Sequence, residues 1–321
     1  MAATKASNRN ILHRFAARSI HAVASRSYSI SKAIYQFGLP DPTVTRPVIV
    51  TTVGKVGSSS IAATLQEALH GRPVAHVHWL AANNLRADEE YYKSRARAYR
   101  GRSEMANFMP RYVWHGQHLG AAIESAPPGV IWDVVTLVRD PLRRNVSSFF
   151  QNLELMYDFW PEKELRSKNA RVIAERLVEM FLNSYVANRS PVEHDGDPLT
   201  WFDREIAPVF GCDLYATPFP FSSGYEIYTS KNARILLLRL EDVERVASAA
   251  LTKFFGTDIR ESVVRNEATD KAYADIYAWF NKLLVLPHAY VEKIYTSRYC
   301  THFYCHSELD RFRSRWRLAS G

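Results

Sequence analysis

Short apolar runs along the chain alternate with longer segments in which apolar residues recur at helical spacing. The candidate strands cover residues 48–53, 74–79, 134–138 and 235–240. The last two are continuous apolar runs, as expected for strands buried on both faces of a parallel sheet. Because strands and helices alternate, the chain is predicted to have an α/β fold with an open parallel sheet flanked by helices.

Glycine, proline and capping residues mark where the predicted helices begin and end. The helix after the first strand ends at Gly71 and Pro73, and Asp140 with Pro141 opens the helix after the third strand. Residues 83–110 are polar and charged without clean periodicity, so no element is predicted there. Further helices are predicted over 117–124, 163–188 and 271–299, the last broken near Pro287, and a loop or hairpin over 215–228.

The positive charge is concentrated in an N-terminal arm. The 321 residues carry a formal net charge of +8, yet residues 1–40 contain six basic residues and no acidic one. The rest of the chain has 35 of the 41 basic residues against 33 acidic ones, so it is nearly neutral. A nearly neutral body argues against binding to a nucleic-acid backbone.

The arm is treated as separate from the body: residues 1–40 form a basic arm, and residues 41–321 form one domain. Residues 10–37 are rich in Arg, Ser and Ala, and three interpretations of them stay open. They fit an organelle transit peptide, a basic amphipathic helix on an anionic membrane surface, or a disordered leader. Peripheral membrane contact through 10–37 is therefore one expectation.

The cysteines and the lack of long apolar stretches indicate a cytoplasmic protein. Cys212, Cys300 and Cys305 are too few for a disulfide framework, and no second pair completes a zinc site. They are expected to be thiols in a reducing compartment. No apolar stretch approaches the roughly 20 residues of a membrane span. Organelle targeting by the arm remains an alternative.

A segment rich in glycine and hydroxyl residues, 51–60, lies between the first strand and its following helix. A turn that opens a helix presents backbone N–H groups and the positive end of the helix dipole to an anion. Gly57 lets the backbone approach a phosphate closely, and Lys55 adds a positive charge. Hydroxyl donors come from Ser58, Ser59 and Ser60. The segment predicts a phosphate-binding loop.

This loop differs from a Walker A loop. That pattern needs a glycine separated by four residues from its Gly-Lys pair, and a Ser or Thr directly after the Lys. Ile49 and Val56 occupy those two positions here. No carboxylate in a Walker B context is evident either, so magnesium-dependent nucleotide chemistry is disfavoured.

A second candidate anion site follows the third strand. Arg139 ends that strand, and Ser147 lies on the helix that Asp140 and Pro141 open. A guanidinium at the strand end and a hydroxyl on the helix can share one oxyanion. The crevice beyond the strand ends is where open α/β sheets bind ligands. Two anion sites on two parallel strands suit a ligand that is phosphorylated at both ends.

These motifs resemble those of the sulfotransferase superfamily, which has a P-loop-type fold. Residues 55–60 resemble its 5′-phosphosulfate loop, and Arg139 with Ser147 resembles its 3′-phosphate motif. Residues 238–242 are similar to a strand-end Arg-Tyr-Glu-Asp pattern, with Leu240 replacing the Tyr. Residues 201–211 look like the bacterial sulfotransferase-like group labelled putative capsular polysaccharide synthesis proteins.

The resemblance implies a donor, 3′-phosphoadenosine 5′-phosphosulfate, and no metal. It implies that the 5′-phosphosulfate is held by Lys55, Gly57, Ser58, Ser59 and Ser60, and the 3′-phosphate by Arg139 and Ser147. Sulfuryl transfer resembles phosphoryl transfer, and Lys55 and the helix N-terminus can stabilise charge on the leaving phosphate. The acceptor is then a hydroxyl, expected on a saccharide.

The acceptor hydroxyl needs a base, and two candidates stay open. His76-Val77-His78 ends the second strand and is similar to the His-x-His of some carbohydrate sulfotransferases. His78 is preferred as the base, with His76 orienting it or binding the acceptor. Glu67 is the rival, although its place on the loop's helix favours a solvated side chain.

Two other functions remain as alternatives. One is a P-loop kinase-like enzyme that uses ATP, which the displaced Lys55 disfavours. The other is a non-catalytic, membrane-associated assembly factor for surface polysaccharide, which the basic arm favours and His78 disfavours. The oligomeric state is not predicted.

Overall fold

The computed structural model describes residues 28–98, 111–153, 159, 164–165, 168–187, 197–259 and 274–319. The chain divides into two compact units. One unit combines Met1–Arg46 with Val77–Pro127, and the other combines Pro47–His76 with Pro128–Gly321. We describe each unit by itself. The predicted division into an arm of residues 1–40 and one domain of 41–321 stays a prediction.

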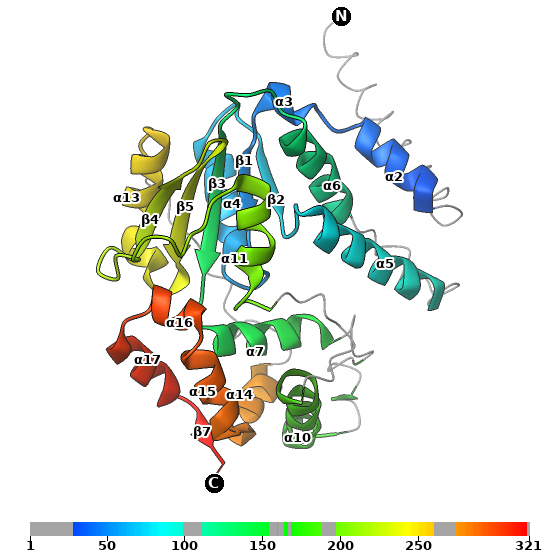
Figure 1. Cartoon of the computed structure of the whole chain (residues 1–321). Coiled ribbons are helices and arrows are strands. Elements are labelled where there is room, and N and C mark those ends of the chain that lie inside the picture. The colour runs from blue at the N-terminus through cyan, green and yellow to red at the C-terminus, as the bar shows by residue number, and fades with distance from the viewer. Residues whose placement is uncertain are drawn as a thin grey trace, which may run out of the picture. The chain divides into compact units, whose positions relative to one another are not determined.

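The second unit is built on a mostly parallel five-stranded sheet (Figure 1) with the order β2-β1-β3-β5-β4. The predicted α/β class with helices flanking the sheet is confirmed. β1 pairs parallel with β3, and β3 pairs parallel with β5 over its whole length. The strands are β1 (Val48–Thr51), β2 (Val74–Val77), β3 (Trp132–Val138), β4 (Tyr225–Thr229) and β5 (Ala233–Arg239).

The two central strands explain why their apolar runs are continuous. Nearly every residue of β3 and β5 is buried, because helices cover both faces of a parallel sheet. β4 is the exception to the parallel order, since it forms an antiparallel hairpin with β5. The hairpin accounts for the second half of the predicted loop or hairpin at 215–228.

Helix α7 and the C-terminal helices gather at the end of the sheet toward which β3 points (Figure 1). Pro287 is the N-cap of α15, so the predicted break in the last helical segment is confirmed. Asn169 caps α10, so this helix begins seven residues after the predicted start. The helices of this unit are α4 (Ser58–Ala68), α7 (Pro141–Gln151), α10 (Ala170–Phe181), α11 (Trp201–Arg204), α12 (Ile206–Phe210), α13 (Val243–Phe255), α14 (Ala274–Leu283), α15 (His288–Tyr295), α16 (Arg298–Phe303) and α17 (His306–Arg313).

Three short elements complete the second unit. A π-helix, Leu182–Val186, extends α10, and a 3₁₀ turn, Leu240–Asp242, precedes α13. β6 (Val285–Leu286) and β7 (Arg317–Leu318) form a separate parallel pair.

The first unit is helical: α2 (Tyr28–Phe37), α3 (Pro42–Thr45), α5 (Ala82–Ala98) and α6 (Arg111–Glu124). Part of the basic arm belongs to it. Lys32 forms an ion pair of 3.1 Å with Glu89, and the Gln36 amide donates to the Trp114 carbonyl. Residues 1–27 lie outside the described part of the chain, and so does most of the predicted membrane or targeting segment 10–37.

Helix α5 was not predicted, and its packing explains the missing signal. Its buried positions include the polar residues Asn84 and Asp88, so apolar residues do not recur at helical spacing. The neighbouring helix α6 has glycines where the backbone of another segment comes close to the helix. A Cβ on Gly116 would lie 2.4 Å from the Trp79 carbonyl oxygen. Within the described residues, no helix is both long and apolar enough to cross a membrane.

Candidate functional site

The loop that follows β1 has the backbone conformation of a tight turn into a helix. Lys55 and Gly57 both have positive φ angles, 73° and 87°, and Gly57 is the N-cap of α4. A Cβ on Gly57 would lie 2.6 Å from Leu240 Cδ1. Only glycine fits this position without strain, because of the left-handed backbone and the nearby Leu240 side chain. Its close approach to a phosphate stays a prediction.

Substituting Gly57 by alanine tests this requirement. We expect Gly57→Ala to lower the free energy of unfolding by about 1–2 kcal/mol for the left-handed backbone, with a further cost because Leu240 must move. Gly71→Ala is the matched control, since Gly71 has a φ of 84° and nothing within 4 Å of its added Cβ. Chemical denaturation of both variants would contradict the expectation if Gly71→Ala were the less stable of the two.

The helix after β3 begins where the sequence predicted. The Asp140 side chain accepts from the backbone N–H groups of Leu142 and Arg143, and Pro141 is the first helical residue. Asp140 is buried, and its Oδ1 also accepts from the Tyr295 hydroxyl at 3.0 Å. Burial and the nearby Glu241 carboxylate raise the pKa of Asp140 to about 6.

The two predicted anion motifs meet in the structure. Arg139 Nη1 donates to the Lys55 carbonyl oxygen at 2.7 Å. On α7, Arg144 Nε donates to the Gly54 carbonyl at 2.9 Å. Two guanidiniums from the β3–α7 junction therefore hold consecutive peptide carbonyls of the β1–α4 loop.

Arg144 was missed in the sequence analysis. It is 1% exposed, and it lies between the buried residues Leu142 and Val146 on α7. A buried arginine is unusual unless it has hydrogen-bond or ion-pair partners. Its position inside a buried stretch of an amphipathic helix was therefore the sequence signal that could have identified Arg144.

Among the described residues, the Arg139 guanidinium forms no ion pair within 4 Å, neither with Asp140 nor with Glu241. Burial lowers its pKa, and the charge of Glu241 acts in the opposite direction. Its peptide is fixed from both sides, because its N–H donates to the Tyr299 hydroxyl and its carbonyl accepts from that hydroxyl.

The remaining loop residues differ in their surroundings. Lys55 Nζ donates to Gln151 Oε1 at 3.0 Å. This hydrogen bond connects the loop to the last residue of α7. Ser58 Oγ lies 2.9 Å from His76 Nε2. Ser59 is exposed and Ser60 is half-buried. His76 thus ties the start of α4 to β2.

Two other predicted residues are also resolved. Ser147 is half-buried on α7 and makes no side-chain hydrogen bond within the described chain. Glu67 is exposed on α4, as the predicted solvated position implies.

His78 lies one residue beyond β2 and belongs to the other unit. Its ring makes an edge contact with Tyr112, at 6.1 Å between centroids. His118 of the same unit contacts the Pro40 carbonyl, and burial lowers the pKa of His115. No group of three or more His, Cys, Asp or Glu in the described ranges is arranged to hold a metal ion.

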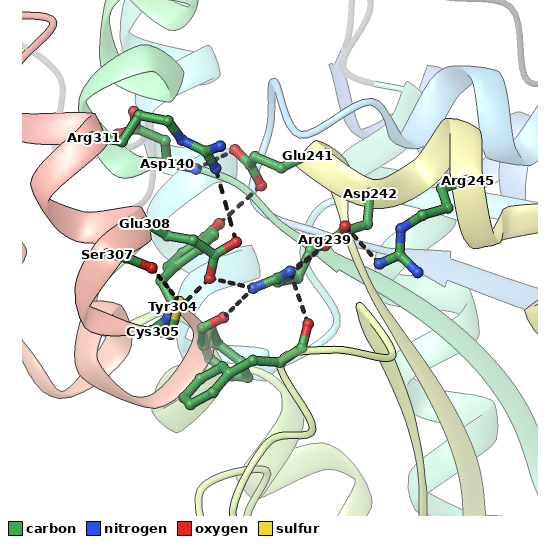
Figure 2. A network of polar contacts seen from close by, with 12 residues as sticks. Asp140, Arg239, Glu241, Asp242, Arg245, Tyr304, Cys305, Ser307, Glu308 and Arg311 are labelled. Carbon is green, nitrogen blue, oxygen red and sulfur yellow. Dashed lines mark hydrogen bonds and ion pairs between the residues drawn. The ribbon is translucent and has the colours of Figure 1, made fainter.

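The strand-end motif at 238–242 contributes Arg239, Glu241 and Asp242 to a largely buried polar network (Figure 2). Arg239 is 3% exposed and pairs with both Asp242 and Glu308. Its Nη1 and Nη2 also donate to two backbone carbonyls, those of Phe303 and Phe221.

Glu241 extends this network to α7. It accepts from the Asp140 N–H at 2.9 Å and from the Tyr304 hydroxyl at 3.1 Å (Figure 2). The network therefore joins the ends of β3 and β5 to α16 and α17.

The aromatic residues of the segment before β4 pack mostly in the core. Tyr215 and Phe219 both pack on Phe303, at 5.5 Å between centroids. Phe219 is buried, whereas Phe221 is 38% exposed. The first two rings therefore anchor this loop to α16.

Comparison with known proteins gives one match. Residues 195–305 match the family model NKWYS, described as putative capsular polysaccharide synthesis protein. The predicted resemblance of 201–211 to this group is confirmed, whereas the sulfotransferase link stays a prediction. The match includes β4, β5 and α13–α16, and ends at Cys305 beside the Arg239 network. No curated protein and no solved structure matches the chain.

Proposed function

We propose that this chain is a sulfotransferase that moves a sulfuryl group from 3′-phosphoadenosine 5′-phosphosulfate to a saccharide hydroxyl. The observation that carries the proposal is the 2.7 Å hydrogen bond between Arg139 Nη1 and the Lys55 carbonyl. It joins two motifs, 84 residues apart, that would each hold one end of such a donor. Their position beyond the ends of parallel strands suits ligand binding.

The residues of the loop fit the 5′ end of the donor. Gly57 leaves the backbone open to close approach, and α4 begins with three serines whose N–H groups face no carboxylate cap. Lys55 lies at the loop's surface, and its bond to Gln151 can be exchanged for a phosphate oxygen.

The second motif fits the 3′ end. One N–H group of the Arg139 guanidinium donates to the Lys55 carbonyl, and the guanidinium forms no ion pair in the described chain. Its other N–H groups can therefore donate to a phosphate. The Ser147 hydroxyl, which has no partner among the described residues, is one further donor. This pairing of guanidinium and hydroxyl is the one the sequence predicts.

The chemistry follows from these positions. In-line sulfuryl transfer builds negative charge on the leaving phosphate, where Lys55 and the N-terminus of α4 stabilise it. The assignment of His78, which belongs to the first unit, as the base for the acceptor hydroxyl stays a prediction from the sequence, with Glu67 as the rival. His76 lies within hydrogen-bond distance of Ser58 in the loop. The saccharide acceptor is proposed from the family description of residues 195–305.

Calorimetry with adenosine 3′,5′-bisphosphate tests the proposal. We expect the wild-type chain to bind this product without added metal, and Arg139→Ala to weaken binding at least tenfold. The loss of a charged hydrogen bond is worth about 1.5–3 kcal/mol, which corresponds to that range. Arg139→Lys keeps the charge and should retain part of the affinity.

Arg171→Ala is the matched control, because Arg171 is an exposed arginine on α10 that forms an ion pair with Glu175 and lies over the Trp279 ring. It should bind like the wild type. Metal-dependent binding of ATP with no binding of the bisphosphate would favour the kinase-like alternative. Binding of neither nucleotide would favour the non-catalytic assembly factor.

A further inference from the structure

A cavity of about 280 Å³ lies in the second unit, apart from the residues assigned to the donor. It is formed by α7, α14 and the segment that leads into β7, which lie together in Figure 1. Its polar and aromatic lining residues are Arg143, Tyr277, Asn281, Arg315, Trp316 and Arg317. Among the described residues that line it there are three arginines and no carboxylate, so this lining is basic.

The three arginines that line this cavity have no ion-pair partner among the described residues, unlike the arginines next to them in sequence. In the C-terminal run, Arg313 pairs with Glu292 and Asp310, and Arg311 lies 4.0 Å from Glu308. Arg143, Arg315 and Arg317 form no ion pair with any carboxylate of the described chain. Three guanidiniums that face one cavity without an ion-pair partner among the described residues suit an anionic ligand.

The cavity wall is held in place by backbone and side-chain contacts. Arg317 pairs in register with Val285 in the β6–β7 ladder, and its Nη1 donates to the Lys282 carbonyl at 2.6 Å. Trp316 Nε1 donates to the Tyr295 hydroxyl, which in turn donates to Asp140. The aromatic wall is therefore fixed against the start of α7.

The cavity is also close to the proposed donor site. The charge of Arg143 lowers the pKa of Arg139, and Tyr277 acts on the same guanidinium in the opposite direction. Two cavity residues thus lie within electrostatic reach of Arg139. None of the residues assigned to the donor is part of the cavity lining.

We propose that this cavity binds an anionic group, a carboxylate or sulfate, of the acceptor saccharide. The assignment of this anionic group to the acceptor rests on the proposed sulfotransferase function. Guanidiniums recognise planar carboxylates and sulfates through paired hydrogen bonds. The rings of Tyr277 and Trp316 and the Asn281 amide suit the apolar face and hydroxyls of a sugar.

Calorimetry of the full chain with two acidic probes tests the proposal: a tetragalacturonate and a chondroitin 4-sulfate tetrasaccharide. We expect at least one to bind, with affinity that falls as salt rises. The double variant Arg315→Gln, Arg317→Gln should bind it at least tenfold more weakly. Neutral maltotetraose should bind much more weakly than the acidic probe.

The double variant Arg171→Gln, Arg311→Gln is the control, because it removes the same net charge at two arginines that pair with glutamates. It should retain binding. The proposal is overturned if neither acidic probe binds the wild type, or if both double variants lose binding equally.

Adenosine 3′,5′-bisphosphate separates the two proposals. If its affinity falls tenfold in Arg315→Gln, Arg317→Gln, the cavity belongs to the nucleotide and the acceptor assignment is overturned. If the bisphosphate never binds but the acidic probe binds through these arginines, the cavity assignment stands and the sulfotransferase proposal fails.

Discussion

Arg239→Ala is expected to lower the free energy of unfolding by about 3–5 kcal/mol, which is the usual cost of breaking a buried ion pair. The guanidinium is 3% exposed and pairs with two carboxylates, Asp242 and Glu308. Removing it leaves both carboxylates without their main partner, and it also frees the Phe303 and Phe221 carbonyls. The measurement is urea denaturation at neutral pH.

Arg245→Ala is the matched control. Arg245 pairs with the same Asp242, at 2.7 Å, but its side chain is 56% exposed. Exposed pairs contribute about 0–1 kcal/mol, so this variant should stay close to the wild type. A loss of under 1 kcal/mol in Arg239→Ala would show that the network contributes little to stability.

Asp140 is expected to lower the stability of the folded chain as pH rises, whereas most carboxylates have the opposite effect. Its pKa of about 6 in the folded chain is above the unfolded value near 3.9. The folded state therefore binds the proton more tightly, and this stabilisation is lost as pH rises through 6. Between pH 4.5 and 7.5, we expect the wild type to lose about 2 kcal/mol relative to Asp140→Asn, which cannot ionise.

Denaturation of both proteins at the two pH values measures this difference, and any constant cost of the asparagine cancels. Asp41→Asn is the control, since Asp41 also caps a helix, but its hydrogen bonds with Thr43 lower its pKa. Asp41 is ionised throughout this pH range, so its substitution should change stability equally at both pH values. An equal change for Asp140→Asn would contradict a raised pKa.

The sequence was sufficient for the parallel strands of the sheet and for the start of α7 because their signals are local. Continuous apolar runs mark β3 and β5, and Asp140 with Pro141 marks the start of α7. The loop before α4 is similarly encoded by Gly57. Each of these features is decided within a few residues.

The parts that were missed depend on partners distant in sequence. The role of Arg144 is set by a carbonyl 90 residues away, and that of Arg239 by a carboxylate 69 residues away. Helix α5 buries polar residues, so apolar periodicity cannot reveal it. The resemblance at 238–242 carried no partner for Arg239, whereas the structure gives its guanidinium four protein partners.

The bonds of Asp140 and Arg139 to the C-terminal helices have a kinetic consequence. Tyr295 and Tyr299 are 155 and 160 residues away from their partners in the chain. Closing such long loops costs entropy before any contact compensates for it, so these contacts belong to the slow, late part of folding. The β1–α4 turn can form early, but Arg139 reaches its final orientation only when α15 and α16 dock. The proposed binding of a phosphate at each end of the donor would therefore require the completely folded second unit, and a partly folded chain would lack it.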